Sequence, residues 1–167
     1  MKKALVVVDV QMEYFPTGLY LQWDVERALD KTIKAIQHFR EKGDLVIVVQ
    51  HIAGQESPIF NPSGTGIDIH PAVLAEAVDA PIIVKAHADS FLNTNLNDVL
   101  QEHAIDSIVV CGIMTQNCVT HTAISSSAAN YQVQVLAEAC TAPDEMVHNI
   151  ALAALNDRVE LISLNQL

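Results

Sequence analysis

The chain has 167 residues, half of them apolar, and its mean hydropathy is +0.25, which is enough to bury a sizeable core and excludes a disordered chain. Nine basic and twenty acidic residues give a net charge of −11, and only 5% of the residues are aromatic. These values argue against nucleic acid and against anionic membranes as partners, and the length suits a single domain over residues 1–167.

In chain order, short apolar runs alternate with segments of helical periodicity. A long loop rich in Gly, Pro and Ser is expected over residues 51–71, a length typical of functional loops. The pattern predicts a strand at 4–8, a helix between Asp24 and Gly43, a strand at 45–49, a helix at 72–78, a strand at 81–84, a helix at 96–103, a strand at 107–111, a helix at 115–130, a strand at 132–136, a helix at 143–155 and a strand at 159–164.

Strands that alternate with helices in this way predict a three-layer α/β/α fold with a six-stranded parallel sheet. In such folds, binding sites gather beyond the carboxyl ends of the strands, near the point where the strand order reverses. Residues that follow the predicted strands are therefore the first candidates for chemistry.

The N-terminus has two lysines before an apolar run, but Asp9 ends that run too early for a signal peptide. No stretch approaches the roughly 20 apolar residues of a membrane span. We therefore expect a cytoplasmic protein. The three cysteines are an odd number and form no CxxC pair, which argues against a disulfide framework and against a structural zinc site.

Three reactive side chains follow predicted strands: Asp9 after the first, Lys85 after the third and Cys118 shortly after the fourth. Each has a plain structural explanation as well, namely a turn aspartate, a surface lysine and a buried inert thiol. Together they supply an acid–base group, a cation and a nucleophile. If Thr115 caps the following helix, Cys118 stands in its first turn, where the helix dipole and a nearby lysine favour a thiolate.

Three segments carry a resemblance to the isochorismatase-like cysteine hydrolase superfamily. They are VVVDVQ at residues 6–11, VKAHADSF at 84–91 and GIMTQNCV at 112–119. The last is the most specific, because the family pattern is a Gly, a few residues, a Thr and then Cys-Val. The resemblance extends over essentially the whole chain.

The resemblance implies that Asp9, Lys85 and Cys118 form a catalytic triad. It also implies a cis peptide bond between Ile113 and Met114, with the N–H groups of Met114 and Cys118 forming an oxyanion hole. The implied strand order is 3-2-1-4-5-6, and the implied assembly is a homodimer or a larger homo-oligomer. Strands three and one would then stand roughly 10 Å apart, so either Lys85 must reach across or the chain must bend for the two residues to meet.

The implied chemistry is hydrolysis of an amide-type C–N bond in a small molecule, through a thioester on the cysteine and without a required metal or other cofactor. Nicotinamidase members of the superfamily bind a metal through an Asp-x-His pair after the second strand. Here that place reads Val49, Gln50 and His51, so the pair is missing. His51 and His70 could in principle meet, but a pocket role for His51 is favoured.

Two other functions stay open. Some members hydrolyse the vinyl ether of isochorismate without a thiol nucleophile, and a member could also be a catalytically silent binder of small molecules. The retained acid, lysine and cysteine favour the thiol route. Candidate substrate contacts flank the strand ends or lie in loops, and core packing explains the aromatic ones equally well. They are Gln11, Phe15, Trp23, His51, Phe60 and Phe91.

Overall fold

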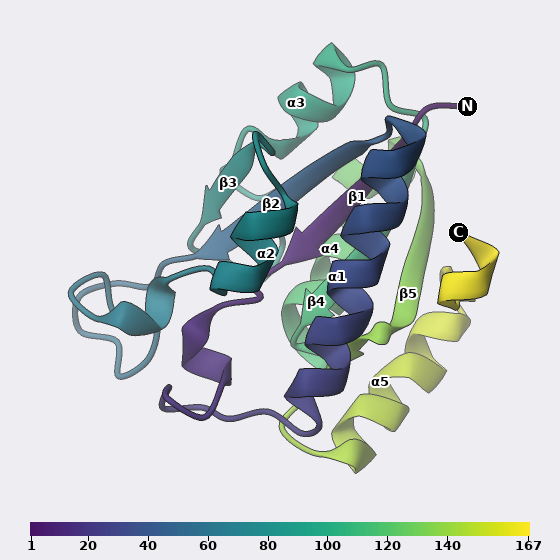
Figure 1. The fold of residues 1–167 in the computed structure, drawn as a ribbon. Helices are drawn as coiled ribbons and strands as arrows, with labels where there is room; N and C mark the ends of the chain where they lie inside the picture. The colour runs from purple at the N-terminus through teal and green to yellow at the C-terminus, as the bar shows by residue number, and fades with distance from the viewer.

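The computed structural model describes all residues from 1 to 167 and contains one six-stranded sheet, all of whose strand pairs are parallel (Figure 1). The strand order is β3-β2-β1-β4-β5-β6, so the predicted architecture and order are confirmed. The strands are β1 (Lys3–Val8), β2 (Leu45–His51), β3 (Ile82–Lys85), β4 (Ser107–Ile113), β5 (Gln132–Thr141) and β6 (Glu160–Ile162).

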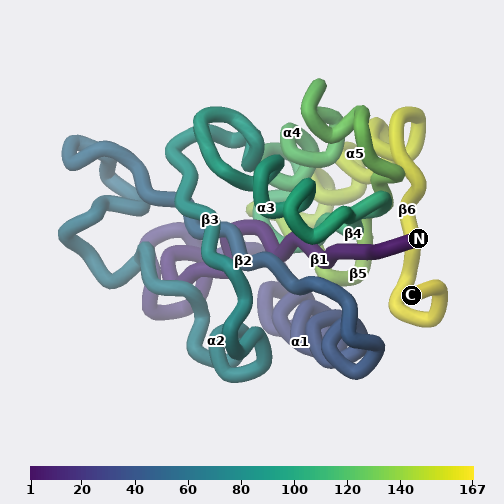
Figure 2. Tube along the Cα trace, turned by 90° about the horizontal axis from the view of Figure 1, so that it is seen from above, coloured from purple at the N-terminus to yellow at the C-terminus, as the bar shows by residue number.

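The helices cover both faces of the sheet. Figure 2 shows α1 and α2 on one side and α3, α4 and α5 on the other. The α-helices are α1 (Val25–Lys42), α2 (Pro71–Glu76), α3 (Leu96–Glu102), α4 (Thr120–Ala123) and α5 (Glu145–Asn156). Four short 3-10 turns are η1 (Met12–Tyr14), η2 (Thr65–Ile67), η4 (Ser127–Asn130) and η5 (Leu164–Gln166), and one π-helical turn is η3 (Thr115–Val119).

The centre of the core is formed by β1 and β4, which lie side by side in the middle of the sheet. Every residue of β4 is buried, and so is every residue of β1 after Lys3. These strands are continuous β-branched and apolar runs because helices cover both of their faces. The strand order reverses between them, and their carboxyl ends therefore mark the expected site.

The helix α1 follows the predicted pattern. Its buried positions include Val25, Ile36 and Phe39, and it ends at Gly43, whose φ of +74° favours glycine. Asp24 stands at the N-cap position, but its side chain does not cap the helix. The carboxylate instead accepts a hydrogen bond from Arg27 Nε at 2.9 Å.

The helix predicted over residues 115–130 is wrong. The segment breaks into η3, α4 and η4, with a turn between the last two. Its hydroxyl side chains form hydrogen bonds of their own: Thr120 Oγ1 donates to the backbone carbonyl of Thr115 at 2.6 Å, and Ser125 Oγ donates to the side chain of Asp89 at 2.7 Å. Such bonds weaken a regular helix, and the periodicity of the apolar residues alone does not reveal them.

The strand β5 continues to Thr141, five residues beyond the predicted end. Its pairing with β4 shifts register between Val110 and Gly112, after which Gly112 pairs with Cys140. Such an irregularity hides the continuation from a simple alternation pattern. The other predicted bounds differ from the observed ones by at most a few residues, as at the end of β6.

Gly112 allows the carboxyl ends of β1 and β4 to approach closely. A Cβ atom at this position would lie 2.0 Å from the carbonyl oxygen of Val8, and the φ of Gly112 is +120°. No other residue fits such a position without moving the backbone. This contact brings the segment after β4 next to Asp9.

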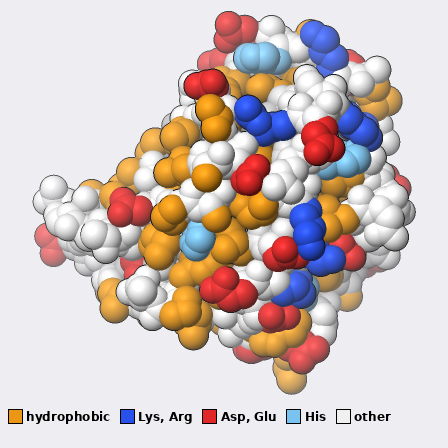
Figure 3. Space-filling view, in the orientation of Figure 1, with side chains coloured by type: hydrophobic (Ala, Val, Ile, Leu, Met, Phe, Trp, Pro, Cys, Tyr) orange, Lys and Arg blue, Asp and Glu red, His pale blue; other side chains and the backbone are white.

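Basic side chains on the face that carries α1 are interspersed with acidic ones and do not gather into one area (Figure 3). None of the helices combines the length with the apolar character that a membrane-spanning helix requires.

Candidate functional site

Asp9 directly follows β1 and is completely buried. Its backbone N–H donates to the carbonyl of Val49 at 3.1 Å, and its φ of +50° lies in the left-handed region, which aspartate tolerates better than most residues. Its Oδ2 forms an ion pair with Lys85 Nζ at 2.8 Å. The ion pair therefore holds the carboxylate in place.

Lys85 is the last residue of β3, and its side chain is completely buried. Besides Asp9, its Nζ contacts the carbonyl of His87 at 2.9 Å, His51 Nδ1 at 3.1 Å and Cys118 Sγ at 3.3 Å. A buried ammonium group needs partners of this kind because desolvation of a charge is costly. The lysine thus joins the three predicted triad residues into one cluster.

Cys118 lies in the turn η3 and is only 4% exposed. The residue before this turn is Met114, and no side chain caps it. The hydroxyl of Thr115 donates instead to the carbonyl of Thr141 at 3.0 Å and lies 2.8 Å from His148 Nδ1. The prediction that Thr115 caps a helix at Cys118 is therefore wrong, and the support for a thiolate that depended on it is absent.

Electrostatics also oppose a thiolate in the resting site. Burial, together with the negative charge of Asp9, raises the pKa of the Cys118 thiol to about 12, although Lys85 opposes the shift. Burial likewise raises the pKa of Asp9, again against the influence of Lys85. The balance favours a protonated thiol at rest, because a single buried cation does not stabilise two neighbouring anions.

The peptide bond between Ile113 and Met114 is cis, as the resemblance implies. The backbone N–H of Met114 donates no hydrogen bond to any backbone or side-chain acceptor. A free N–H group beside the nucleophile turn is a suitable donor for a developing negative charge.

A cavity of about 210 Å³ opens above Cys118. Of the predicted substrate contacts, His51 and Phe60 line it. Gln11 does not: its amide nitrogen donates to the carbonyls of His51 and Ile67, both at 2.8 Å, so it fixes the backbone around the site.

The other three predicted substrate contacts also lie outside this cavity. Phe15 is buried and packs on His70, with ring centroids 4.5 Å apart. Trp23 packs on His148, and Phe91 stacks on Tyr131. Their roles in the structure are therefore packing contacts, the alternative that the sequence left open.

Sequence reasoning missed several residues of the cavity wall, among them Tyr14, Ser57, Ala88 and Asn117. Two of them had a usable signal: Asn117 immediately precedes the nucleophile, and Tyr14 lies five residues after Asp9, in the loop that follows a strand end. The other two lie in long loops, whose path the sequence does not specify.

The histidines do not form a metal site. His51 Nδ1 faces the ammonium group of Lys85 at 3.1 Å, and His70 Nδ1 accepts a hydrogen bond from the backbone of Ala72 at 3.2 Å. No three His, Cys, Asp or Glu side chains stand close enough together to hold a metal ion. The donor set that a resident metal requires is therefore not present around Cys118.

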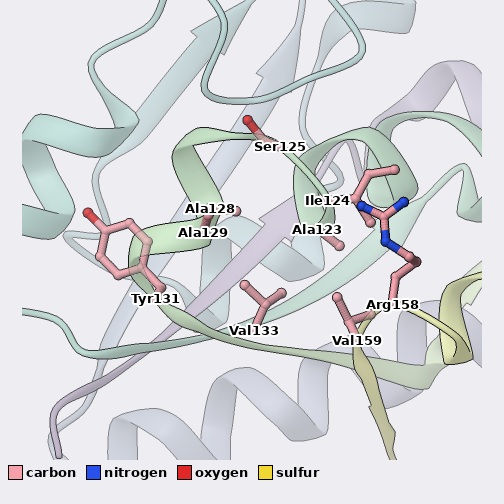
Figure 4. Close-up of a pocket in the computed structure, with 9 residues that line it drawn as sticks. All are labelled: Ala123, Ile124, Ser125, Ala128, Ala129, Tyr131, Val133, Arg158 and Val159. Carbon is pink, nitrogen blue, oxygen red and sulfur yellow. The ribbon is translucent and has the colours of Figure 1, made fainter.

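A second hollow of about 250 Å³ lies between α4, η4, the strand β5 and the residues just before β6 (Figure 4). Its wall is mostly apolar, with Tyr131 at one end and Arg158 at the other, as Figure 4 shows. None of the three triad residues lines it. The cavity above Cys118 is thus the candidate active site.

Comparison with known proteins supports the resemblance. The family model of the isochorismatase domain matches residues 3–166. A Bacillus subtilis (strain 168) protein, named uncharacterized isochorismatase family protein YddQ, is 37% identical over an alignment of 167 positions. The alignment covers 93% of this chain and 92% of the relative. Streptothricin hydrolase of Streptomyces noursei is 28% identical over an alignment of 173 positions, which covers 96% of this chain and 68% of that protein.

The solved structure of an isochorismatase-like hydrolase from Alkaliphilus metalliredigens superimposes with a TM-score of 0.90 over 99% of this chain and 97% of that chain. At 22% sequence identity, this likeness shows the shared fold.

Proposed function

The chain belongs to the isochorismatase family of hydrolases, and on this basis we propose that it is a cysteine hydrolase that cleaves an amide-type C–N bond of a small molecule without a required metal. One observation carries the proposal. Lys85 Nζ lies 2.8 Å from Asp9 Oδ2 and 3.3 Å from Cys118 Sγ, and Cys118 itself lines the cavity of about 210 Å³.

The first step is transfer of the Cys118 proton to Asp9, whose raised pKa makes it a better base than an exposed aspartate. The transfer moves the negative charge from one neighbour of Lys85 to the other, so the total charge of the buried cluster does not change. The new thiolate then attacks the amide carbon. A bond forms between Sγ and carbon, and the carbonyl π electrons move to oxygen.

The resulting oxyanion accepts hydrogen bonds from the backbone N–H groups of Met114 and Cys118. Asp9 passes its proton to the amide nitrogen, the C–N bond breaks, and the amine leaves. Water then attacks the thioester while Asp9 accepts its proton. The C–S bond breaks, the carboxylic acid leaves, and the proton returns to Cys118.

The test is hydrolysis of a panel of small amides, measured as released ammonia, by the wild type and by Cys118→Ser. Hydroxylamine added during turnover should convert the thioester to a hydroxamate and free thiol, and mass spectrometry should find the acyl group on Cys118. Cys140→Ser is the matched control, because Cys140 is buried in β5 and does not line the cavity. Unchanged hydrolysis in Cys118→Ser would exclude the thioester route.

One observation favours a second candidate, hydrolysis of an isochorismate-type vinyl ether. The pKa values of Asp9 and Cys118 are both raised, so Asp9 is suited to donate a proton while the thiol stays protonated. That activity would survive in Cys118→Ser and disappear in Asp9→Asn. A protein that hydrolyses neither amides nor isochorismate, with an unreactive Cys118, would be a silent member of the family.

A further inference from the structure

The hydroxyl of Tyr14 is a polar group without a partner in the cavity wall. Tyr14 lines the cavity together with Cys118 and Met114, and the residue as a whole is 2% exposed. Its hydroxyl forms no hydrogen bond with the protein, and the hydroxyl oxygen is not sealed inside the core. Buried phenols usually have a hydrogen-bond partner. The missing partner is therefore expected from whatever fills the cavity.

His51 supplies a second donor in the same wall. An ammonium group has only donors, so the contact of Lys85 Nζ with Nδ1 at 3.1 Å requires Nδ1 to accept and places the ring proton on Nε2. Gln11 holds the backbone of His51 from both sides, since it accepts from the N–H and donates to the carbonyl, each at 2.8 Å. The Nε2–H group donates to no acceptor in the protein.

Phe60 holds these two donors in fixed positions. Its ring packs edge-on against Tyr14, with ring centroids 5.0 Å apart, and against His51, with centroids 5.3 Å apart and planes at 89°. Its own backbone N–H donates to the buried carboxylate of Glu13 at 2.8 Å. Tyr14 Oη–H and His51 Nε2–H, which we call the donor wall, are thus in position before any ligand binds, and this reduces the entropy lost on binding.

Both side chains keep the protonation states that this role needs. Burial, followed by the negative charges of Asp9 and of a Cys118 thiolate, raises the pKa of Tyr14 well above its usual value, so the phenol retains its proton. Burial, followed by the charges of Lys85 and His87, lowers the pKa of His51 to about 4, so the ring is neutral at pH 7.

We infer that Tyr14 Oη–H and His51 Nε2–H select a substrate whose acyl group is small and carries a hydrogen-bond acceptor, such as a hydroxyl or carbonyl oxygen. This inference rests on the proposed function. An apolar acyl group would leave these donors unpaired and lose the binding energy that they provide. The cavity, at about 210 Å³, is smaller than the roughly 300 Å³ at which pockets for drug-sized ligands begin.

Aldehydes test the donor wall without a need for turnover. An aldehyde adds reversibly to Cys118: the thiol sulfur bonds to the carbonyl carbon, and the thiol proton moves to the oxygen. We would compare 2-hydroxypropanal with 2-methylpropanal, and 3-hydroxybutanal with 3-methylbutanal, because each pair differs only by a hydroxyl in place of a methyl group. Binding is measured as protection of Cys118 from iodoacetamide, with the labelled cysteine located by mass spectrometry.

The decisive variant is Tyr14→Phe, which deletes only the hydroxyl. Its matched control is Tyr20→Phe, the same change in a ring whose centroid lies 6.1 Å from that of Tyr14 and that does not line the cavity. For at least one pair, we expect Tyr14→Phe to reduce the preference for the hydroxy aldehyde by about fivefold, as loss of one hydrogen bond predicts. Tyr20→Phe should leave the preference unchanged.

Two outcomes would overturn the inference. In one, Tyr14→Phe and the wild type show equal preferences for both pairs. In the other, iodoacetamide labels Cys118 but no aldehyde protects it. If iodoacetamide fails to label Cys118 in the wild type even at pH 9 over many hours, the proposed function fails first, and the inference that depends on it fails with it.

Discussion

Lys85 Nζ lies 2.8 Å from Asp9 Oδ2, although β2 separates the strands that carry the two residues. The register explains how. Val8 pairs with Val49 on β2, whereas Lys85 pairs with His51, two residues further along the same strand. Lys85 therefore stands beyond the end of β1, and its long side chain crosses above β2 to reach Asp9. The side chain of Lys85 bridges the distance of roughly 10 Å between alternate strands, and the backbone turns at Asp9, whose φ is +50°.

Asp9 and Cys118 both lie beside the ammonium group of Lys85. We therefore expect Asp9→Asn to raise the reactivity of Cys118 toward iodoacetamide and to lower the rate of amide hydrolysis. Removal of the carboxylate leaves Lys85 without its anion, and a Cys118 thiolate then becomes the available partner. The pKa of Cys118 should fall from about 12, and iodoacetamide should label it faster at pH 7 than in the wild type. Amide hydrolysis should fall by about 100-fold or more, because the proton acceptor and donor is lost.

The control for this prediction is Asp30→Asn, a change in an exposed carboxylate that pairs with Lys34 on α1. It should change neither the labelling rate nor the hydrolysis rate. Slower labelling of Cys118 in Asp9→Asn would contradict the electrostatic account, because it would mean that the carboxylate favours the thiolate in the resting protein.

Lys85→Met should strongly destabilise the fold. The methionine fills much of the space of the lysine side chain but leaves Asp9 as a buried carboxylate without a cation, which costs about 3–5 kcal/mol in the free energy of unfolding. The loss should shrink as the pH falls, because a protonated Asp9 needs no cation. Urea unfolding at pH 7 and at pH 5 measures both effects.

Lys34→Met is the matched control, since this lysine forms an exposed pair in which both side chains are 54% exposed. Exposed pairs contribute little, so its change should stay within about 0.5 kcal/mol. Equal losses in the free energy of unfolding of the two variants would show that the buried ion pair contributes no more to stability than the exposed pair.

Gly112→Ala should impair both folding and activity. The added Cβ would meet the carbonyl of Val8 at 2.0 Å, in a backbone conformation that side chains rarely adopt. Separation of β1 from β4 would move Asp9 away from Cys118. Gly54→Ala is the control, because nothing lies within 4 Å of its Cβ position. Thermal unfolding and amide hydrolysis should change in the first variant and stay near wild type in the second.

The sequence predicts the sheet well because its strands are continuous apolar runs, and the three residues predicted to form a triad lie together because each follows a strand end closely. The predicted thiolate is disfavoured for a different reason. Whether Cys118 is ionised depends on burial and on the balance between Asp9 and Lys85, and neither can be read from the chain. Likewise, the partners of Gln11 and the packing of Phe15 depend on where the loop over residues 51–71 runs, which local patterns do not specify.

Stability should also depend on pH through His51. Its pKa is about 4 in the folded protein and about 6.5 in an unfolded chain. Between these values the unfolded state binds more protons, so stability is full above pH 6.5 and is lost as the pH falls toward 4.

His51→Asn removes the titrating ring while an amide oxygen can still accept from Lys85. The melting temperature of this variant should therefore fall less between pH 7 and pH 4 than that of the wild type. Part of the fall should remain, because burial also lowers the pKa values of His70 and His148. Parallel curves for the two proteins would show that protonation of His51 is not coupled to folding, and the neutral ring inferred from its contact with Lys85 would lose its support.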